Sequence, residues 1–247
     1  MNVACPQCGA PNELRSGERL LRCVSCGSSL YVDRAGLVSH YRVPRLLDAE
    51  QARAALRRWM AGNDTVKDLD RKASIAEVVA FSFPMWLFRT RAASGELVIV
   101  EPAAPTPIPQ LADLDVPAGR LEPYGRGEEG VESVAAAVPL ETARGWLGQR
   151  GTGEPTESAL VHLPLWRCLY RYQDKTYTAI VDGSAGTVLA AVFPAKAEAP
   201  YLLVAGLGLL LFGVEGLAIG NLLHKLLVYA VTAVPLLGLA FWVTRRV

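Results

Sequence analysis

The stretch FSFPMWLFRTR, residues 81–91, sets the expected topology because a second stretch, VHLPLWRCLYR at residues 161–171, repeats its pattern. Both run apolar, proline, apolar, tryptophan and then alternate. The corresponding residues are Pro84, Trp86, Pro164 and Trp166. Apolar and aromatic residues in alternation predict β-strands. Both tryptophans are expected in a core rather than in an aromatic ligand box.

Each stretch belongs to a larger unit, since a polar turn and a second apolar run follow it and a helical pattern precedes it. The predicted turns and second strands are 93–95, 97–100, 173–175 and 177–181. The predicted helices are 48–60 and 141–147, each after a Val-Pro pair, Val43-Pro44 or Val138-Pro139. Asp48 can cap the first helix. The unit is therefore present twice, at about 43–104 and 138–194, and we expect two units to pair because one two-stranded ribbon would leave a face exposed.

The second copy continues as YTAIVDGSAGTVLAAVFP, residues 177–194, with a turn predicted at 182–186 between two apolar strands. This phrase resembles the strand, Asp, turn, Gly, strand signature of PepSY-type domains. The resemblance implies a fold and no activity. Between the copies, the Pro-rich 101–107 and the Gly/Glu-rich 122–130 are predicted to form a surface loop.

N-terminal to the repeats, CPQCGAPNELRSGERLLRCVSCGSS, residues 5–29, holds two Cys-x-x-Cys pairs with fourteen residues between them. Two such pairs can place four thiolates around one tetrahedral ion. The predicted metal ligands are Cys5, Cys8, Cys23 and Cys26. Gly9 and Gly27 follow the pairs, where a positive φ lets backbone N–H groups turn toward the sulfurs. With short strands expected at 20–22 and 30–32, residues 1–33 resemble a zinc ribbon of the rubredoxin-like kind.

Structural zinc is the preferred interpretation, because four cysteines leave no open coordination position. A module of about thirty residues buries too little apolar surface to fold alone, so the metal is expected to stabilise it. Iron held as in rubredoxins is the alternative, although the gap between the pairs is shorter than theirs. A disulfide framework disagrees with the odd count of five cysteines and with the lack of an apolar signal segment before Cys5. The fifth cysteine, Cys168, is expected to be a buried apolar residue.

The C-terminal part, from residue 199 to residue 242, is almost entirely apolar. Apart from tyrosine, its ionisable residues are Glu215, His224 and Lys225. A span needs about 20 residues, so we predict two transmembrane helices, from Tyr201 to about Ile219 and from about Leu226 to Val243, joined by a tight turn in the polar break 220–225. Glu215 lies about one turn from the end of the first span, where water or Lys225 can satisfy it; a pathway or a partner protein is the alternative.

Flanking charge predicts the orientation of this hairpin. Lys196 precedes the first span, and Arg245 and Arg246 follow the second, whereas the turn carries Lys225 alone. Because basic residues flank spans on the cytoplasmic side, both termini are expected in the cytoplasm. The reduced cysteines agree with this assignment. We therefore expect a multi-pass protein of the inner (cytoplasmic) membrane.

The predicted fold class is α+β, with a four-cysteine zinc ribbon at 1–33, a duplicated helix-plus-hairpin domain at 34–198 and a two-helix transmembrane hairpin at 199–247. This order of parts resembles bacterial zinc-ribbon membrane proteins. The resemblance implies an architecture and no particular chemistry.

The sequence shows no catalytic motif, such as a phosphate-binding glycine loop, a metalloprotease helix or a nucleophile elbow. His40 and His162 are single histidines among apolar residues and are expected to be packed. We therefore predict that the chain is not an enzyme and has no catalytic residue, no small-molecule substrate and no cofactor besides the metal. Charge disfavours nucleic acid as a partner: the net charge is +1 for the chain, and 17 basic against 19 acidic residues at 35–195 give −2 there.

The functional hypothesis is a membrane-tethered docking or assembly module with protein partners at the inner membrane face. The alternatives are an iron-containing electron carrier and a membrane-bound regulator that contacts nucleic acid. The sequence names no partner and no pathway.

Overall fold

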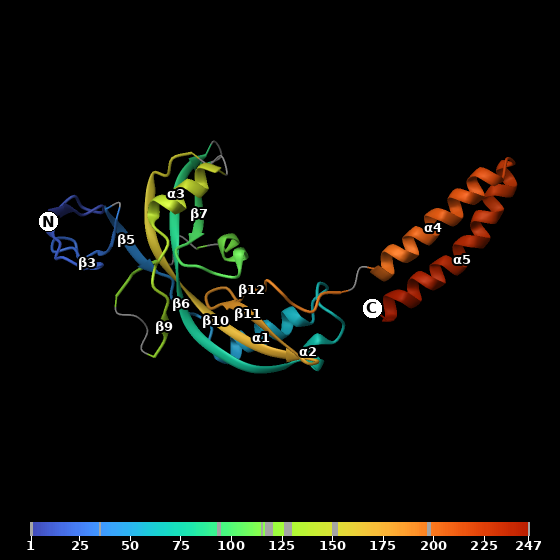
Figure 1. Cartoon of the computed structure of the whole chain (residues 1–247), viewed down its shortest axis with the longest axis horizontal. Helices are drawn as coiled ribbons and strands as arrows, with labels where there is room; N and C mark the ends of the chain where they lie inside the picture. The colour runs from blue at the N-terminus through green and yellow to red at the C-terminus, as the bar shows by residue number, and fades with distance from the viewer. Residues whose placement is uncertain are drawn as a thin grey trace. The chain divides into compact units, whose positions relative to one another are not determined.

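The computed structural model describes residues 2–34, 36–92, 95–114, 116, 121–125, 130–149, 153–196 and 199–246 (Figure 1). Two compact units are present. The first comprises Met1–Trp59 and Ala73–Phe193, and the second comprises Met60–Lys72 and Pro194–Val247. Mixed α and β structure, a cluster of four cysteines near the N-terminus and a long apolar helix at the C-terminus confirm the coarse features of the predicted fold class.

Two long antiparallel strands, β6 (Ser74–Ala92) and β10 (Glu157–Tyr172), form the centre of the first unit. The strands β7 (Gly95–Pro102) and β11 (Lys175–Asp182) fold back on them as the two predicted hairpins (Figure 1). The turn predicted at 173–175 is observed at residues 173–174, with Lys175 already in β11, whereas Ala93 and Ser94 of the other turn lie outside the described residues. The alternation read from the two quoted stretches therefore identified the central strands correctly.

The two hairpins have the same register when residue numbers differ by 80. Met85 pairs with Pro102 in the first hairpin, and Leu165 pairs with Asp182 in the second. Between β6 and β10, Phe83 pairs with Leu163, again 80 residues apart. The β6–β10 register is thus symmetric about this pair.

Proline occupies both central strands near that point, where a missing backbone N–H would ordinarily break a ladder. The carbonyl of Pro84 accepts a hydrogen bond from Ala103 (3.0 Å), and that of Pro164 accepts one from Gly183 (2.7 Å). The N–H and C=O of a strand residue point toward the same neighbouring strand. Since both proline carbonyls accept hydrogen bonds from residues outside the β6–β10 pair, both proline nitrogens also face away from that pair. On that side β5 (Gly36–Arg42) ends at the position opposite His162, and β11 ends opposite Leu165. Pro164 therefore lies between the part of β10 that pairs with β5 and the part that pairs with β11.

Two helices, α1 (Ala49–Met60) and α3 (Leu140–Gln149), precede the hairpins as predicted. Asp48 caps α1, since its carboxylate accepts from the Gln51 N–H (2.8 Å) while the Gln51 side chain accepts from the Asp48 N–H. Each tryptophan holds the segment before a helix. Trp86 Nε1 donates to the carbonyl of Val138 (2.9 Å), and Trp166 Nε1 donates to that of Leu47 (3.1 Å).

These contacts refine two sequence expectations. Both tryptophans are packed, with 0% of Trp86 and 9% of Trp166 exposed, so their assignment to the core is confirmed. Leu47 and Val138 are equivalent, because the carbonyl of each accepts a hydrogen bond from one of the two tryptophans. The Val-Pro pairs in the sequence predict a different alignment, in which Val43 is equivalent to Val138. Val43 instead corresponds to Val134, because their N–H groups donate to His162 and Ser82 respectively, each at 2.9 Å.

Only part of the N-terminal region continues the same sheet. A separate two-stranded sheet contains β1 (Asn2–Ala4) and β2 (Pro11–Glu13). The expected strands at 20–22 and 30–32 are present as β3 (Leu20–Arg22) and β4 (Ser29–Asp33), and β4 pairs with β5, which runs parallel to β10. Residue 33, the expected boundary, is the last residue of β4 and pairs with Gly36 of β5.

The segment expected as a surface loop at 101–107 is partly core, which corrects that prediction. Ala103 and Ala104 are 0% and 2% exposed. Further along the chain, Ile108 and Leu111 belong to the same buried cluster as Met85 and Val161. The short elements of this region are η1 (Pro109–Asp113), β8 (Glu122–Pro123) and β9 (Glu132–Ser133), and a further strand, β12 (Val188–Leu189), pairs with β11. Of the expected loop 122–130, residues 126–129 lie outside the described part.

The second unit joins the segment containing α2 (Leu69–Lys72) to the chain before the apolar helices. A bridge pairs Thr65 with Ala195, and Lys196 N–H donates to the carbonyl of Asp64. The helix α4 (Ala199–Ala218) is followed by α5 (Leu222–Arg246). Within α5, Leu222–Val243 is long and apolar enough to cross a membrane, while the described apolar part of α4, Leu202–Ala218, is shorter.

The start of α5 and the surroundings of Glu215 differ from expectation. Asn221 caps α5, since its side-chain oxygen accepts from the N–H groups of Leu223 and His224, so the helix begins at residue 222 rather than 226. Glu215 accepts a hydrogen bond from Thr232 on α5, whereas Lys225 donates to the carbonyl of Gly216 (2.7 Å). One carboxylate oxygen of Glu215 is therefore bonded by the other helix rather than by the turn, while its second oxygen, Oε2, is buried without a hydrogen-bond partner among the described residues.

Candidate metal centre

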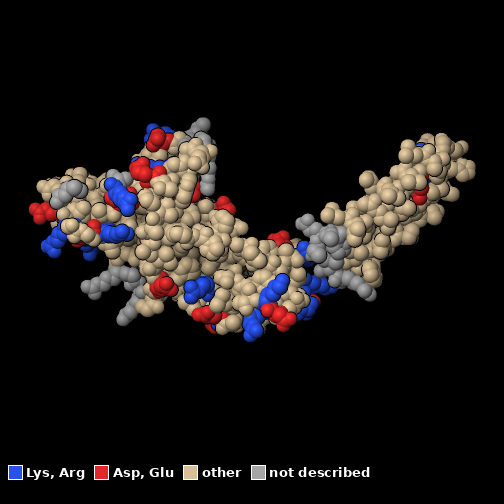
Figure 2. Space-filling view, in the orientation of Figure 1, with Lys and Arg blue, Asp and Glu red and all other residues tan. Residues whose placement is uncertain are grey.

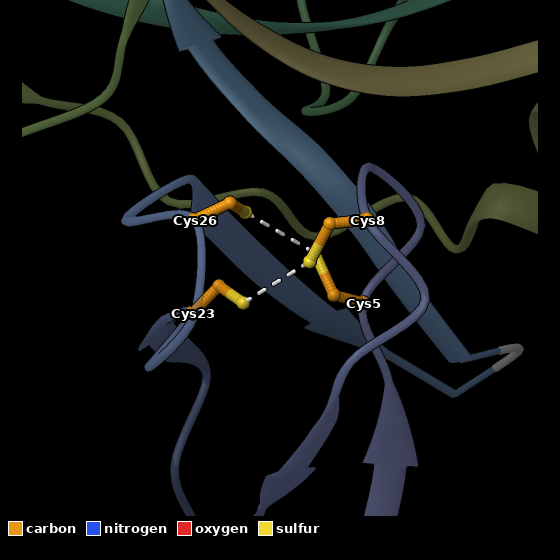
Figure 3. A group of neighbouring side chains, drawn as sticks. All are labelled: Cys5, Cys8, Cys23 and Cys26. Carbon is orange, nitrogen blue, oxygen red and sulfur yellow. Dashed lines mark hydrogen bonds between the residues drawn. The ribbon is translucent and has the colours of Figure 1, made fainter.

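The four predicted ligands converge, two from each Cys-x-x-Cys loop (Figure 3). Their sulfur atoms all lie within 4.8 Å of one another. The Sγ atoms of Cys5 and Cys26 are 3.8 Å apart, and those of Cys8 and Cys23 are 3.7 Å apart. A tetrahedral ion with a metal–sulfur distance of about 2.3 Å requires sulfurs about 3.8 Å apart, so the cluster fits one ion. All five cysteines are free thiols, which excludes a disulfide framework in the described chain.

Both loops have the same backbone geometry. The Gly9 N–H donates to the Cys5 carbonyl (2.8 Å), and the Gly27 N–H donates to the Cys23 carbonyl (3.0 Å). Gly9 and Gly27 have φ angles of +74° and +72°, in the region that favours glycine, as the sequence predicted. Each tight turn directs both cysteine side chains of its pair to one side.

Asn12 connects the two loops and was not identified from the sequence. This residue of β2 is 2% exposed. Its side-chain nitrogen donates to the Ala10 carbonyl (2.9 Å) and faces the Cys23 sulfur at 3.6 Å, while its oxygen accepts from the Val24 N–H (3.1 Å). A single side chain thus orients both halves of the centre, as partners of metal ligands commonly do.

The centre has a buried and an exposed side. Cys5 and Cys23 are buried and pack with Leu30, whereas Cys8 and Cys26 are exposed. The backbone N–H of Cys26 lowers the pKa of Cys23 to about 6, with further contributions from Ser25 and Asn12, so the thiolate needed for metal binding is favoured. Four thiolate donors suit zinc and iron alike, and the geometry supports a bound metal without naming it.

The remaining residues singled out in the sequence lie apart from this centre. Cys168 is 0% exposed, which confirms its assignment as a buried apolar residue, and burial raises the pKa of its thiol to about 11. His40 and His162 are packed, as expected, with 2% and 6% exposed. They are not isolated, however, because β5 and β10 bring their rings to 5.1 Å between centroids.

Comparison of the chain with protein-family models, with curated proteins and with solved structures finds no match.

Proposed function

We propose that this chain is a membrane-tethered, non-enzymatic zinc-ribbon protein that docks or assembles other proteins at the cytoplasmic face of a bacterial inner membrane. The observation that carries the proposal is the presence, in one chain, of a four-cysteine centre and of an apolar helix long enough to cross a membrane. Tethering raises the effective concentration of a docking surface near membrane partners without adding a contact.

Zinc is the metal that we assign to the four cysteines. A closed set of four thiolates provides no open position for a substrate, so the ion stabilises the fold of the ribbon rather than performing chemistry. Because β3 and β4 belong to the same sheet as β5 and β10, the ion also fixes one end of that sheet.

We further propose that α4 and α5 enter the membrane together as a hairpin with both chain ends in the cytoplasm. The contacts between the helices support this, because Tyr229 OH donates to the Phe212 carbonyl (3.1 Å) and Thr232 donates to Glu215. The flanking basic residues Lys196, Arg245 and Arg246 support the orientation. A membrane-impermeant thiol reagent should then label Cys8 and Cys26 only after cells are permeabilised and zinc is chelated; labelling in intact cells would reverse the orientation.

The soluble part is proposed to be a duplication in which the two copies exchange their helical segments. The hairpin registers and the Pro84 and Pro164 hydrogen bonds repeat at an offset of 80 residues. The tryptophan of each copy holds the segment before the helix of the other copy. This crossed arrangement covers both hairpins and provides a rigid support for the ribbon.

The second cysteine loop is the proposed docking surface. Val24, between Cys23 and Cys26, is 82% exposed, and Leu20 on the edge strand β3 is 52% exposed. On the face shown in Figure 2, basic and acidic side chains of the first unit are interspersed, while α4 and α5 are mostly uncharged. An apolar tip on a surface of balanced charge favours a protein partner over nucleic acid.

Capture of partners from solubilised membranes tests this function. Val24→Glu should lose the proteins that the wild-type chain captures while its zinc content stays unchanged, since the Val24 side chain is exposed and is not a ligand. Val192→Glu is the matched control, because Val192 is also exposed (70%) but lies outside the ribbon. The docking proposal fails if both variants capture the same proteins as the wild type.

An electron carrier with iron at the four cysteines is the second candidate. The exposure of Cys8 and Cys26 favours it, because electrons enter such centres through an exposed sulfur edge. Metal identity and colour distinguish the two candidates.

A further inference from the structure

A second cluster of metal-ligating side chains lies in the first unit, apart from the four cysteines. It contains His40 on β5 and His162 on β10, whose ring centroids are 5.1 Å apart. Tyr124 covers the pair, with its ring stacked on His40 at 4.0 Å and tilted toward His162 at 4.6 Å. Both imidazoles are more than nine-tenths buried.

The hydrogen bonding of the two rings is unequal. Nδ1 of His162 lies 3.2 Å from Ser82 Oγ and 3.4 Å from Ser133 Oγ, which fixes the ring and leaves Nε2 for another partner. Both ring nitrogens of His40 are buried, and neither has a hydrogen-bond partner among the described residues. An unsatisfied imidazole in a protein interior is costly, so the site is expected to be completed by a ligand.

The separation of the rings suits a single metal ion. With a metal–nitrogen distance of about 2.0–2.1 Å and tetrahedral angles, two imidazoles on one ion have centroids about 5 Å apart. The observed 5.1 Å agrees with this value. The Ser82 and Ser133 hydroxyls on Nδ1 of His162 resemble the partners that usually orient a metal-binding histidine from its other nitrogen.

A pocket adjoins the site on the side of His40, and burial keeps both imidazoles neutral. A pocket of about 320 Å³ reaches His40 between the ribbon residues Leu21 and Leu30 and the segment that holds Tyr124. Burial, together with the neighbouring His162, lowers the pKa of His40 to about 3, and burial lowers the pKa of His162 to about 4. Both rings are therefore neutral near pH 7. Each has a nitrogen lone pair that a metal ion can bind without first displacing a proton.

The cluster is present in only one of the two halves of the sheet. By the offset of 80 residues, the position equivalent to His162 in the other half is Ser82. Since Val43 is equivalent to Val134, the position equivalent to His40, three residues earlier, is Val131. The related place therefore has no imidazole, although the surrounding strands pair in the same way. The fold does not need two histidines at this point, which indicates a specialised role.

We propose that His40 and His162 bind one divalent transition-metal ion, with water in the remaining coordination positions. Imidazole nitrogen is a donor that zinc, copper and nickel accept. Two protein ligands and open positions make this site weaker than the four-cysteine centre and exchangeable through the pocket.

The test is a calorimetric titration of zinc into untagged, full-length protein whose cysteine centre already holds one zinc. The wild type should take up a second equivalent. His40→Phe retains the ring that stacks on Tyr124 but has no ring nitrogen, and His162→Gln retains a hydrogen-bonding side chain; each should lose the second equivalent and keep the first. His224→Gln, which alters the third histidine of the chain, should behave as the wild type.

Two results would overturn the proposal: a wild type that binds no second equivalent, or a second equivalent that persists in His40→Phe. X-ray absorption of the wild type with two zinc ions gives an answer that does not depend on the folding of any variant. Half of the zinc should have nitrogen and oxygen ligands and half should have sulfur; sulfur alone would contradict the assignment.

Discussion

Asn12 performs a task that neither Cys-x-x-Cys loop can perform alone, since its amide bonds Ala10 and Val24 from opposite loops and approaches the Cys23 sulfur. Removal of such an outer partner typically costs about 10- to 100-fold in metal affinity. We expect Asn12→Ala to weaken zinc binding by that factor, measured by competition with a chromophoric chelator. Asn2→Ala, at an exposed position of β1, is the matched control and should leave the affinity unchanged. Equal affinities in all three proteins would contradict the role of Asn12.

Cys168 offers a second test at this scale. With a pKa of about 11, only about one thiol in a thousand is ionised at pH 8, against about a quarter for an ordinary cysteine of pKa about 8.5. We therefore expect iodoacetamide to leave Cys168 unmodified in the folded protein and to modify it after unfolding in urea. Peptide mass mapping measures both states. Rapid modification in the folded protein would show that β10 opens locally.

The ligands were predictable and their surroundings were not, for one physical reason. The spacing of Cys5, Cys8, Cys23 and Cys26 is local, and a tight turn brings each pair together whatever the rest of the chain does. Asn12 and the His40–His162 pair depend on which strands become neighbours. No short-range pattern marks β5 as the parallel neighbour of β10, so two distant histidines appeared isolated in the sequence.

At the scale of elements, alternation and turn residues predicted the two hairpins, and the capping residue predicted α1. The burial of Ala103 and Ala104 was missed because proline and alanine around them resemble a loop, while the chain there covers the apolar face of the sheet. The sequence does not locate the start of α5, because Asn221 lies in a polar break and only the structure shows that it caps the helix.

The turn between β11 and β12, which is hydrogen-bonded to Pro164 of β10 through Gly183, gives the test of this sheet. A Cβ added at Gly183 would lie 2.7 Å from the carbonyl oxygen of Pro164 and 3.1 Å from the Arg45 guanidinium. We expect Gly183→Ala to lower the free energy of unfolding by about 1–3 kcal/mol, measured by urea denaturation. Gly125→Ala is the control, because nothing lies within 4 Å of its added Cβ. If the two variants are equally stable, the hydrogen-bonded turn onto Pro164 is not formed as described.

At the scale of the whole molecule, the part of the chain before α4 should separate cleanly from the apolar helices. Residues 194–196 contact Asp64, Thr65 and Val66. Truncation after Lys196 should therefore give a soluble, folded product that keeps its metal. Truncation after Phe193 removes those contacts and should melt at a lower temperature. Calorimetry and fractionation of cell extracts measure both; a 1–196 fragment that stays with the membrane would contradict the proposed anchor.

The metal of the four-cysteine centre tests the central claim most directly. Metal content and the visible spectrum should be measured on full-length protein purified without added metal, alongside Cys5→Ser and Cys23→Ser. A structural zinc centre predicts a colourless wild type and one zinc fewer in each variant, with the variants still in the membrane fraction. An iron-containing wild type with a visible absorption band that bleaches on reduction and disappears in the variants would contradict the account and identify an electron carrier.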